Sequence, residues 1–427
     1  MKKILYILLI LPFFMNGQGW EKTFSGSNLE IDYSAQQTTD GGYIIAGTIG
    51  FSSWDLYLIK TDANGIEQWN RTYGGPYIDW DCSVQQTSDG GYIICGITNS
   101  FGNGDFDIWL IKTNSSGDSL WSKTFGGADH DLGYSVQQTT DGGYIIVGNT
   151  ESYGNGDTDV WLIKTDSSGD SIWSKTFGGA DDDLGYSVQQ TIDGGYIITG
   201  STWSFSNGDN NLYMIKTDDN GDSLWTKTFG EQYEDLGYSI KQTTDAGYIV
   251  AGITVSSFIG GHDLYIIKTD ENGDSLWTKT FGGADYDLGY SVQQTIDGGY
   301  IIAGSTESYG NGGFDVWLIK TDSSGDSLWT KTFGGAHNDK GYSVQQTIDG
   351  GYIICGSTNS FKIGYIYLIK TDGNGNITST FNIPTPNPNR KIESIVDILG
   401  RETKPKSNTP FIEIYDDGSV EKKLIVE

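Results

Sequence analysis

The stretch from Gly133 to Phe177 reads GYSVQQTTDGGYIIVGNTESYGNGDTDVWLIKTDSSGDSIWSKTF. Four short segments in it, residues 133–139, 143–150, 159–166 and 171–177, are rich in β-branched and aromatic residues and are bounded by Gly, Asp, Asn or Ser. The strings TDGG and DSSGD between them are typical of hairpin turns. The stretch therefore predicts a meander of four antiparallel strands.

The same unit occurs seven times along the chain. Its DGGYII string, or a variant of it, recurs at intervals of 49, 52, 52, 52, 52 and 52 residues and begins at Asp40, Asp89, Asp141, Asp193, Asp245, Asp297 and Asp349. A tryptophan, which we call the marker Trp, recurs in the same register at Trp20, Trp69, Trp121, Trp173, Trp225, Trp277 and Trp329. Four antiparallel strands in about 50 residues is the period of a propeller blade, whereas a β-solenoid coil is shorter. We therefore expect an all-β fold, a seven-bladed β-propeller of four-stranded antiparallel blades over residues 18–383.

The strand types at the two ends of the repeats predict how the ring closes. Trp20–Phe24 matches the fourth strand of a unit, and the last unit ends with a third strand, Tyr365–Asp372. Trp20–Phe24 can therefore complete the seventh blade. In the alternative, Asn376–Phe381 fills that place, although this segment lacks the marker Trp.

Composition and charge exclude several classes of protein. The 427 residues include 61 Gly and 13 Trp, and 55 acidic residues against 26 basic ones give a net charge of -29. The glycine and aromatic content disfavours a helical bundle, a coiled coil or a disordered chain. The negative charge argues against a nucleic-acid partner, since binding to phosphates needs basic residues. We expect a monomer.

The first 17 residues predict a secretory signal peptide. Lys2 and Lys3 precede an apolar run from Ile4 to Met15, which is too short to span a bilayer. We therefore expect cleavage near Gly17, no transmembrane segment, and a secreted protein located at the outer cell surface or in the extracellular medium.

Residues 384–427 predict a separate small β module that follows a proline-rich spacer. This segment has two strand-like runs and does not continue the repeat. PNPN at Pro386–Asn389, VDILGRE at Val396–Glu402 and the terminal DDGSVEKKLIVE resemble the C-terminal sorting domains of type IX secretion in Bacteroidetes. The resemblance implies export by the type IX secretion machinery, followed by release or attachment at the surface. In the alternative, the segment is a β appendage of the main domain.

The repeat itself resembles known propeller motifs in part. The turn T-D-x-x-G-D-S-L-W, for example Thr269–Trp277, resembles the tryptophan-docking motif of quinoprotein propellers, with one residue fewer between Asp and Gly. It also resembles the Asp-box hairpin of sialidase-type propellers, with one residue more on each side of Gly. Over about 360 residues the chain is similar to uncharacterised repeat propellers of secreted Bacteroidetes proteins, a likeness that implies the fold and carries no activity.

Two sets of loops are expected on one face of the ring, which we call the top face. They are the loops that join one unit to the next and those between the second and third strands. The unit-joining loops carry an acid at one fixed place, here called the acidic ring: Glu30, Asp79, Asp131, Asp183, Asp235, Asp287 and Asp339. These residues predict either a negatively charged, cation-binding mouth of the central channel or carboxylates that accept backbone N–H bonds within the turn.

The loops between the second and third strands carry two further candidate sites. In ESYGNGDTD, the oxygen-bearing residues Asn155, Asp157 and Asp159 suggest a calcium site. Calcium is the one cofactor considered for these loops. One aromatic per unit lies in the same loops, and we call these residues the loop aromatics: Phe51, Phe101, Tyr153, Phe205, Phe258, Tyr309 and Phe361. They predict either flat platforms for sugar rings or covers over the blade edges.

Catalysis finds little support in the sequence. A nucleophile, a base and an orienting group must converge asymmetrically, whereas seven similar units supply most candidates in sevenfold sets. His130 and His337 lie in equivalent loops and His262 in another, without a zinc or serine-hydrolase motif. We expect Cys95 and Cys355 to be buried free thiols, and the marker Trp side chains to pack between blades.

These observations favour a secreted or surface-displayed binding or adhesion propeller, which recognises a polymer such as a glycan or a matrix protein through its top-face loops. The alternative is an extracellular hydrolase or a quinone-dependent oxidoreductase that uses the propeller as a scaffold. A non-repeated cluster of acids or histidines in one pocket would favour the enzyme, and a flat, sevenfold top face would favour binding.

Overall fold

The structure is a computed structural model that describes residues 19–25, 33–50, 53–206, 208–230, 232–255, 261–361, 364–377, 391–397, 401–404, 411–415 and 420–423. For residues 81, 82, 397, 411–415 and 420–423 it describes the backbone alone. Over these ranges it contains strands β1 to β31 and no helix. The chain divides into two compact units, residues 1–378 and 379–427. The expected signal peptide lies outside the described residues, as do Glu30, Phe51, Phe258 and residues 378–390.

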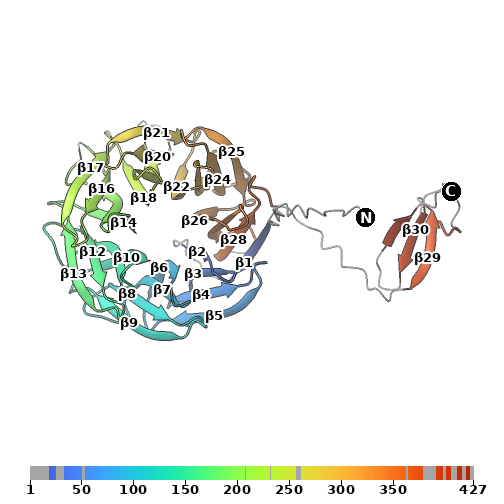
Figure 1. Ribbon diagram of the computed structural model, residues 1–427, viewed down its shortest axis with the longest axis horizontal. Coiled ribbons are helices and arrows are strands. Elements are labelled where there is room, and N and C mark those ends of the chain that lie inside the picture. The colour runs from blue at the N-terminus through green and yellow to red at the C-terminus, as the bar shows by residue number, and fades with distance from the viewer. Residues whose placement is uncertain are drawn as a thin grey trace, which may run out of the picture. The chain divides into compact units, whose positions relative to one another are not determined.

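Seven four-stranded antiparallel sheets form a ring, which confirms the predicted seven-bladed β-propeller (Figure 1). The innermost strands are β2 (Ser34–Gln37), β6 (Asp79–Gln86), β10 (Asp131–Gln138), β14 (Asp183–Gln190), β18 (Asp235–Gln242), β22 (Asp287–Gln294) and β26 (Asp339–Gln346). The second strands are β3 (Tyr43–Ile49), β7 (Tyr92–Thr98), β11 (Tyr144–Thr150), β15 (Tyr196–Thr202), β19 (Tyr248–Thr254), β23 (Tyr300–Thr306) and β27 (Tyr352–Thr358).

The outer half of each blade consists of a third and a fourth strand. The third strands are β4 (Asp55–Thr61), β8 (Asp107–Thr113), β12 (Asp159–Thr165), β16 (Asn211–Thr217), β20 (Asp263–Thr269), β24 (Asp315–Thr321) and β28 (Tyr365–Thr371). The fourth strands are β5 (Glu67–Tyr73), β9 (Ser119–Phe125), β13 (Ser171–Phe177), β17 (Ser223–Phe229), β21 (Ser275–Phe281), β25 (Ser327–Phe333) and β1 (Trp20–Phe24).

The hydrophobic core lies between neighbouring blades. The second and third strands are buried along all or most of their length, as β11 and β12 are at every position, because a blade packs against each of their faces. Between the second and third blades, Leu110 and Ile146 belong to one cluster of buried side chains with Val136 and Trp161. The fourth strands instead alternate between exposed and partly buried residues, as expected of an outer edge that has water on one side.

Each marker Trp joins one blade to the next. The Trp121 ring packs edge-on against the Tyr144 ring, with centroids 5.9 Å apart. Gly169 in the next blade has a φ of +79°, and a Cβ there would lie 2.6 Å from the Trp121 ring, so this turn needs glycine both for its backbone conformation and for space. The contact recurs around the ring and ends with Trp20 against Tyr43, with centroids 5.6 Å apart.

The N-terminal strand β1 is the fourth strand of the seventh blade. It pairs antiparallel with β28, with Trp20 opposite Lys370 and Phe24 opposite Ile366. The Tyr367 hydroxyl, on β28, donates a hydrogen bond of 2.5 Å to the Glu21 carboxylate. The last blade is thus composed of both ends of the repeat array, as the strand order favours. Of the alternative segment, residues 378–381 lie outside the described residues.

An ion pair holds the hairpin between the first and second strands of every blade. In the third blade the Asp141 carboxylate accepts hydrogen bonds from the Thr139 hydroxyl (2.5 Å) and the Gly143 N–H (2.9 Å). It also lies 2.9 Å from the ammonium of Lys164, whose side chain is 5% exposed. Burial acts to raise the pKa of Asp141, but these hydrogen bonds outweigh it and lower the pKa to about 2.

The C-terminal unit contains one antiparallel sheet of three strands, β29 (Ile392–Asp397), β30 (Phe411–Tyr415) and β31 (Val420–Lys423). Across the described ranges of both units, no helix is long and apolar enough to cross a membrane.

Candidate binding face and central channel

The described members of the acidic ring are buried. The Asp131 carboxylate accepts hydrogen bonds from the Gly127 N–H (2.8 Å) and the Ser152 hydroxyl (2.7 Å). Asp287 accepts the equivalent bonds from Gly283 (2.8 Å) and Ser308 (2.6 Å). These contacts are those of a carboxylate that stabilises its own loop, which was the second interpretation of the sequence pattern. Cation binding by the acidic ring stays a prediction.

The structure brings a second carboxylate against most of these acids, a pairing that the sequence did not predict. Asp159, at the start of β12, and Asp183, in the next blade, converge on Gly178. A Cβ on Gly178 would lie 1.8 Å from Asp159 Oδ1 and 2.8 Å from Asp183 Oδ2, so only glycine fits between them. In the fifth blade Asn211 takes the place of the first acid, beside Asp235.

The electrostatics of these pairs are unfavourable at neutral pH. Burial raises the pKa of Asp107 to about 6; a hydrogen bond from the Asn103 N–H opposes the rise, and the Asp131 charge adds to it. Asp107 Oδ1 and Asp131 Oδ1 are buried without a hydrogen-bond partner in the part of the chain that the structure describes. Burial first, and then the neighbouring carboxylate, also raise the pKa of Asp55, Asp159 and Asp315.

The three residues suggested for calcium do not gather around one point as ligands. Asn155 and Asp157 are exposed, whereas Asp159 is buried. The Asn155 N–H donates a 2.6 Å hydrogen bond to Asp159 Oδ2, which occupies an oxygen that a metal would need. Among the described residues, no group of three or more His, Cys, Asp or Glu side chains could hold a metal ion. Calcium binding at this loop stays a prediction.

The five described loop aromatics cover the blade edges and are also partly exposed; their use as platforms for sugar rings stays a prediction. They are about half exposed: Phe101 44%, Tyr153 48%, Phe205 49%, Tyr309 47% and Phe361 52%. Each packs against an aromatic ring of the third strand, as Tyr153 does against Trp161 with centroids 5.1 Å apart. The Tyr153 hydroxyl donates to the Gly126 carbonyl (3.1 Å), which fixes the ring in place. The rings thus cover the blade edge and still offer apolar area to a ligand.

The histidines and cysteines that the sequence singled out do not form one site. His130 is 3.7 Å from the Asp105 carboxylate and His262 is 3.5 Å from that of Glu234, both on partly exposed loops. Cys95 and Cys355 are both fully buried, as the sequence indicated. The Cys82 side chain lies outside the described residues.

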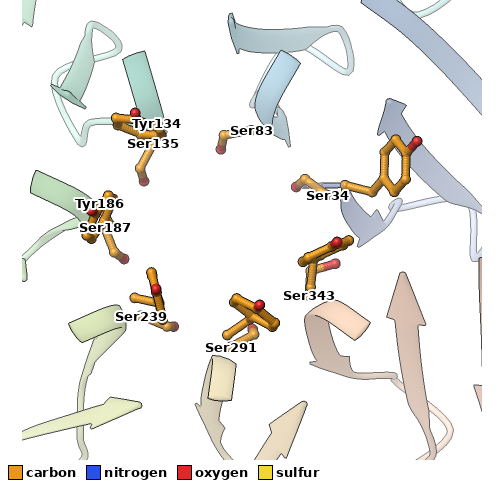
Figure 2. A pocket seen from close by; sticks show the side chains of 13 residues that line it. Ser34, Ser83, Tyr134, Ser135, Tyr186, Ser187, Ser239, Ser291 and Ser343 are labelled. Carbon is orange, nitrogen blue, oxygen red and sulfur yellow. The ribbon is translucent and has the colours of Figure 1, made fainter. Parts of the chain in front are cut away.

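The sequence did not predict a site inside the central channel. A cavity of about 220 Å³ is lined by tyrosines and serines of the inner strands, which surround one opening (Figure 2). The register shifts between Gly133 and Ser135, so Tyr134 lies in a β-bulge, and this irregularity recurs in the inner strands. Adjacent rings such as Tyr186 and Tyr238 pack with centroids 5.3 Å apart. The signal in the sequence is the GYS string, present near the start of five of the seven inner strands, which the strand pattern alone explains without a site.

The face opposite the top face exposes large aliphatic side chains. Ile192, Ile296 and Ile348, in the turns that follow the inner strands, are 87%, 89% and 83% exposed. Ile296 and Ile348 also line an open groove of about 760 Å³ together with Tyr43.

Comparisons with known proteins support the fold without naming a function. No family model matches the chain. The regulatory protein FlaEY of Caulobacter vibrioides is 27% identical over 202 residues, covering 41% of this chain and 21% of FlaEY. The chain therefore spans about a fifth of that relative's length.

Among solved structures, a chain of the COPII outer coat vertex on membranes is 12% identical, with a TM-score of 0.51, covering 92% of this chain and 99% of that one. Puromycin hydrolase is 12% identical, with a TM-score of 0.50, covering 90% of this chain and 58% of that one. At such identities these likenesses establish the propeller fold alone.

Proposed function

We propose that the protein is a binding propeller that recognises a polymer through the loop aromatics of its top face. The observation that carries the proposal is the repetition of one half-exposed ring in every blade where the loop is described. A flat aromatic ring held by a neighbouring ring is a rigid platform for a sugar or for an apolar peptide side chain. A glycan or an extracellular matrix protein is the ligand class that this surface fits.

Repetition also favours a multivalent ligand. Similar loops are not each adapted to a different partner, but a polymer can engage several of them at once. With per-site affinities of about 1 mM, sites linked on one rigid ring raise the apparent affinity by roughly 10² to 10⁴. The net charge of -29 repels polyanions, so neutral or basic polymers are better candidates than sulfated ones.

Export belongs to the same proposal. Residues 1–17 act as a secretory signal, and residues 384–427 act as a type IX sorting domain that delivers the ring to the outer cell surface or the medium. The support is the sequence resemblance of the C-terminal segment. The extracellular hydrolase or quinone-dependent oxidoreductase remains the alternative from another class.

A second candidate is a protein-binding scaffold that uses the opposite face. It is favoured by the groove that Ile296 and Ile348 line together, since exposed apolar side chains that share one surface mark contacts with proteins. FlaEY is called a regulatory protein, and this candidate is compatible with such a role.

The experiment that tests the proposal is an array of glycans and matrix proteins probed with the purified protein, with and without calcium. Binding to one or more neutral or basic polymers, with weak binding to the matching monosaccharides, supports it. Binding that needs calcium would add the predicted metal role of Asn155, Asp157 and Asp159. The second candidate would replace the proposal if the protein binds no polymer but captures a protein, and if Ile296→Ser and Ile348→Ser abolish that capture.

A further inference from the structure

The inner strand of each blade has a free edge whose N–H groups need acceptors, and side chains of the preceding blade supply them. Ser135 Oγ accepts the Val188 N–H (3.4 Å) and Gln137 Oε1 accepts the Gln190 N–H (2.6 Å). The same glutamine contact is made at six junctions, by Gln36, Gln85, Gln137, Gln189, Gln293 and Gln345.

These contacts decide what the glutamines present to the channel. A backbone N–H must be matched by an oxygen, so each amide turns its Nε2 hydrogens elsewhere. Five of the six glutamines line a channel cavity of about 230 Å³: Gln36, Gln85, Gln137, Gln293 and Gln345. Among the described residues none of these Nε2 groups has a hydrogen-bond partner. The side chains of this layer therefore have unused donors.

One residue breaks the pattern of the glutamine layer. The fifth blade has Lys241 where the other blades have glutamine, and Lys241 lines the same cavity. An ammonium cannot accept a hydrogen bond, so this junction lacks the contact that glutamine makes at the other six. No carboxylate is among the residues that line the cavity. Burial lowers the pKa of the Lys241 amine.

We propose that the central channel binds a small oxyanion, a carboxylate or a phosphate, with Lys241 as its counter-charge and the glutamine amides and serine hydroxyls as donors. Lys241 brings a positive charge into a cavity whose lining includes no carboxylate, and an anion beside it would compensate that charge. The cavity volume of about 230 Å³ suits a ligand of a few non-hydrogen atoms. This site is independent of the loop aromatics and goes beyond the polymer-binding function.

The test is calorimetric titration of the full chain with sodium phosphate and, separately, with sodium acetate, in a buffer of an organic base with chloride as its only anion. We expect at least one of the two anions to bind, and the stronger one identifies the ligand class. Lys241→Gln, which restores the residue of the other blades, should weaken that binding at least tenfold. Lys241→Arg should retain it, and Lys175→Gln, on the outer strand β13, is the matched control and should not change it.

Thermal melting in phosphate-free buffer shows whether Lys241→Gln is folded, so that a loss of anion binding is not mistaken for a loss of structure. Lys241→Gln should melt no lower than the parent protein, because the new amide can accept the Gln294 N–H. The proposal is overturned if neither anion binds at concentrations of about 10 mM. It is also overturned if Lys241→Gln folds and binds the anion as well as the parent.

Discussion

At the scale of single residues, the ring contains two kinds of carboxylate, one with a lowered pKa and one with a raised pKa. Asp141 and its equivalents are paired with a buried lysine, so that their pKa lies below the usual value and the charged form stabilises the fold. Asp107 and its equivalents face a second carboxylate across a glycine, and Asp107 titrates near pH 6. A group whose pKa is raised on folding costs stability above that pKa, and the cost disappears as the pH falls towards the value in the unfolded chain.

We therefore predict that Asp107→Asn stabilises the protein at neutral pH. The amide carries no charge and can donate a hydrogen bond to Asp131, and the fifth blade already has Asn211 at this place. The gain should be about 1 to 3 kcal/mol at about pH 7.5 and should shrink as the pH falls from about 6 to about 4. Denaturant unfolding at several pH values measures it. Asp157→Asn, in the corresponding exposed loop of the next blade, is the control, and an equal gain at every pH would contradict the account.

At the scale of strands, two segments from opposite ends of the repeat array close the ring. β1 supplies the marker Trp of the seventh blade, which packs on Tyr43 of the first, and Glu21 receives the Tyr367 hydroxyl bond. Without β1, the edge of β28 would be unpaired and the junction between the last and first blades would lose its aromatic contact.

Trp20→Ala should therefore lower stability by about 3 to 5 kcal/mol, the cost of removing a packed tryptophan. Deletion of residues 18–25 should lower the melting temperature further. Glu21→Gln, which keeps the strand and an acceptor for Tyr367, is the control and should have a small effect. Unchanged melting of the deletion variant would show that another segment completes the blade.

The strand-scale architecture could be predicted because it depends on local pattern. The 52-residue period, the hairpin strings and the strand type at each end determine blade number and order of pairing. The meeting of Asp159 with Asp183 could not be predicted, because it depends on how adjacent blades approach one another. Lys241 could have been found from the sequence, because it is the one residue that departs from the QQ pair of the inner strands. Its role could not be predicted, because the sequence does not show which side chains line the channel.

At the scale of the whole molecule, the negative charge belongs almost wholly to the repeats. Residues 18–383 carry 47 acids and 17 bases, whereas residues 384–427 carry eight acids and seven bases. The C-terminal residues also form a separate compact unit with its own sheet. We therefore expect the ring to fold without that unit, for which we propose the role of an export signal.

A chain that ends at Ile383 should have the melting temperature of the full chain within the error of about 1 °C, since residues 1–378 form a compact unit of their own. In the native host it should remain inside the cell envelope instead of reaching the surface. Failure of the shortened chain to fold, or surface export that persists without residues 384–427, would contradict the division into ring and address.

Paired substitution of two loop aromatics tests the central claim, multivalent binding at the top face, most directly. Tyr153 and Tyr309 both lie in the string ESYGNG and both donate a hydrogen bond to a glycine carbonyl. Tyr153→Phe with Tyr309→Phe keeps the ring, as Phe101 and Phe205 do in other blades, and serves as the matched control.

The decisive measurement is the affinity of Tyr153→Ala with Tyr309→Ala for the polymer selected on the array, compared with both single variants and the Phe control. The account predicts a loss in the double variant greater than the product of the two single losses, with the Phe control close to the parent and the monomeric sugar weakly bound throughout. Normal polymer binding by a double Ala variant that melts much lower than the parent would contradict the account and leave the loop aromatics as covers of the blade edges.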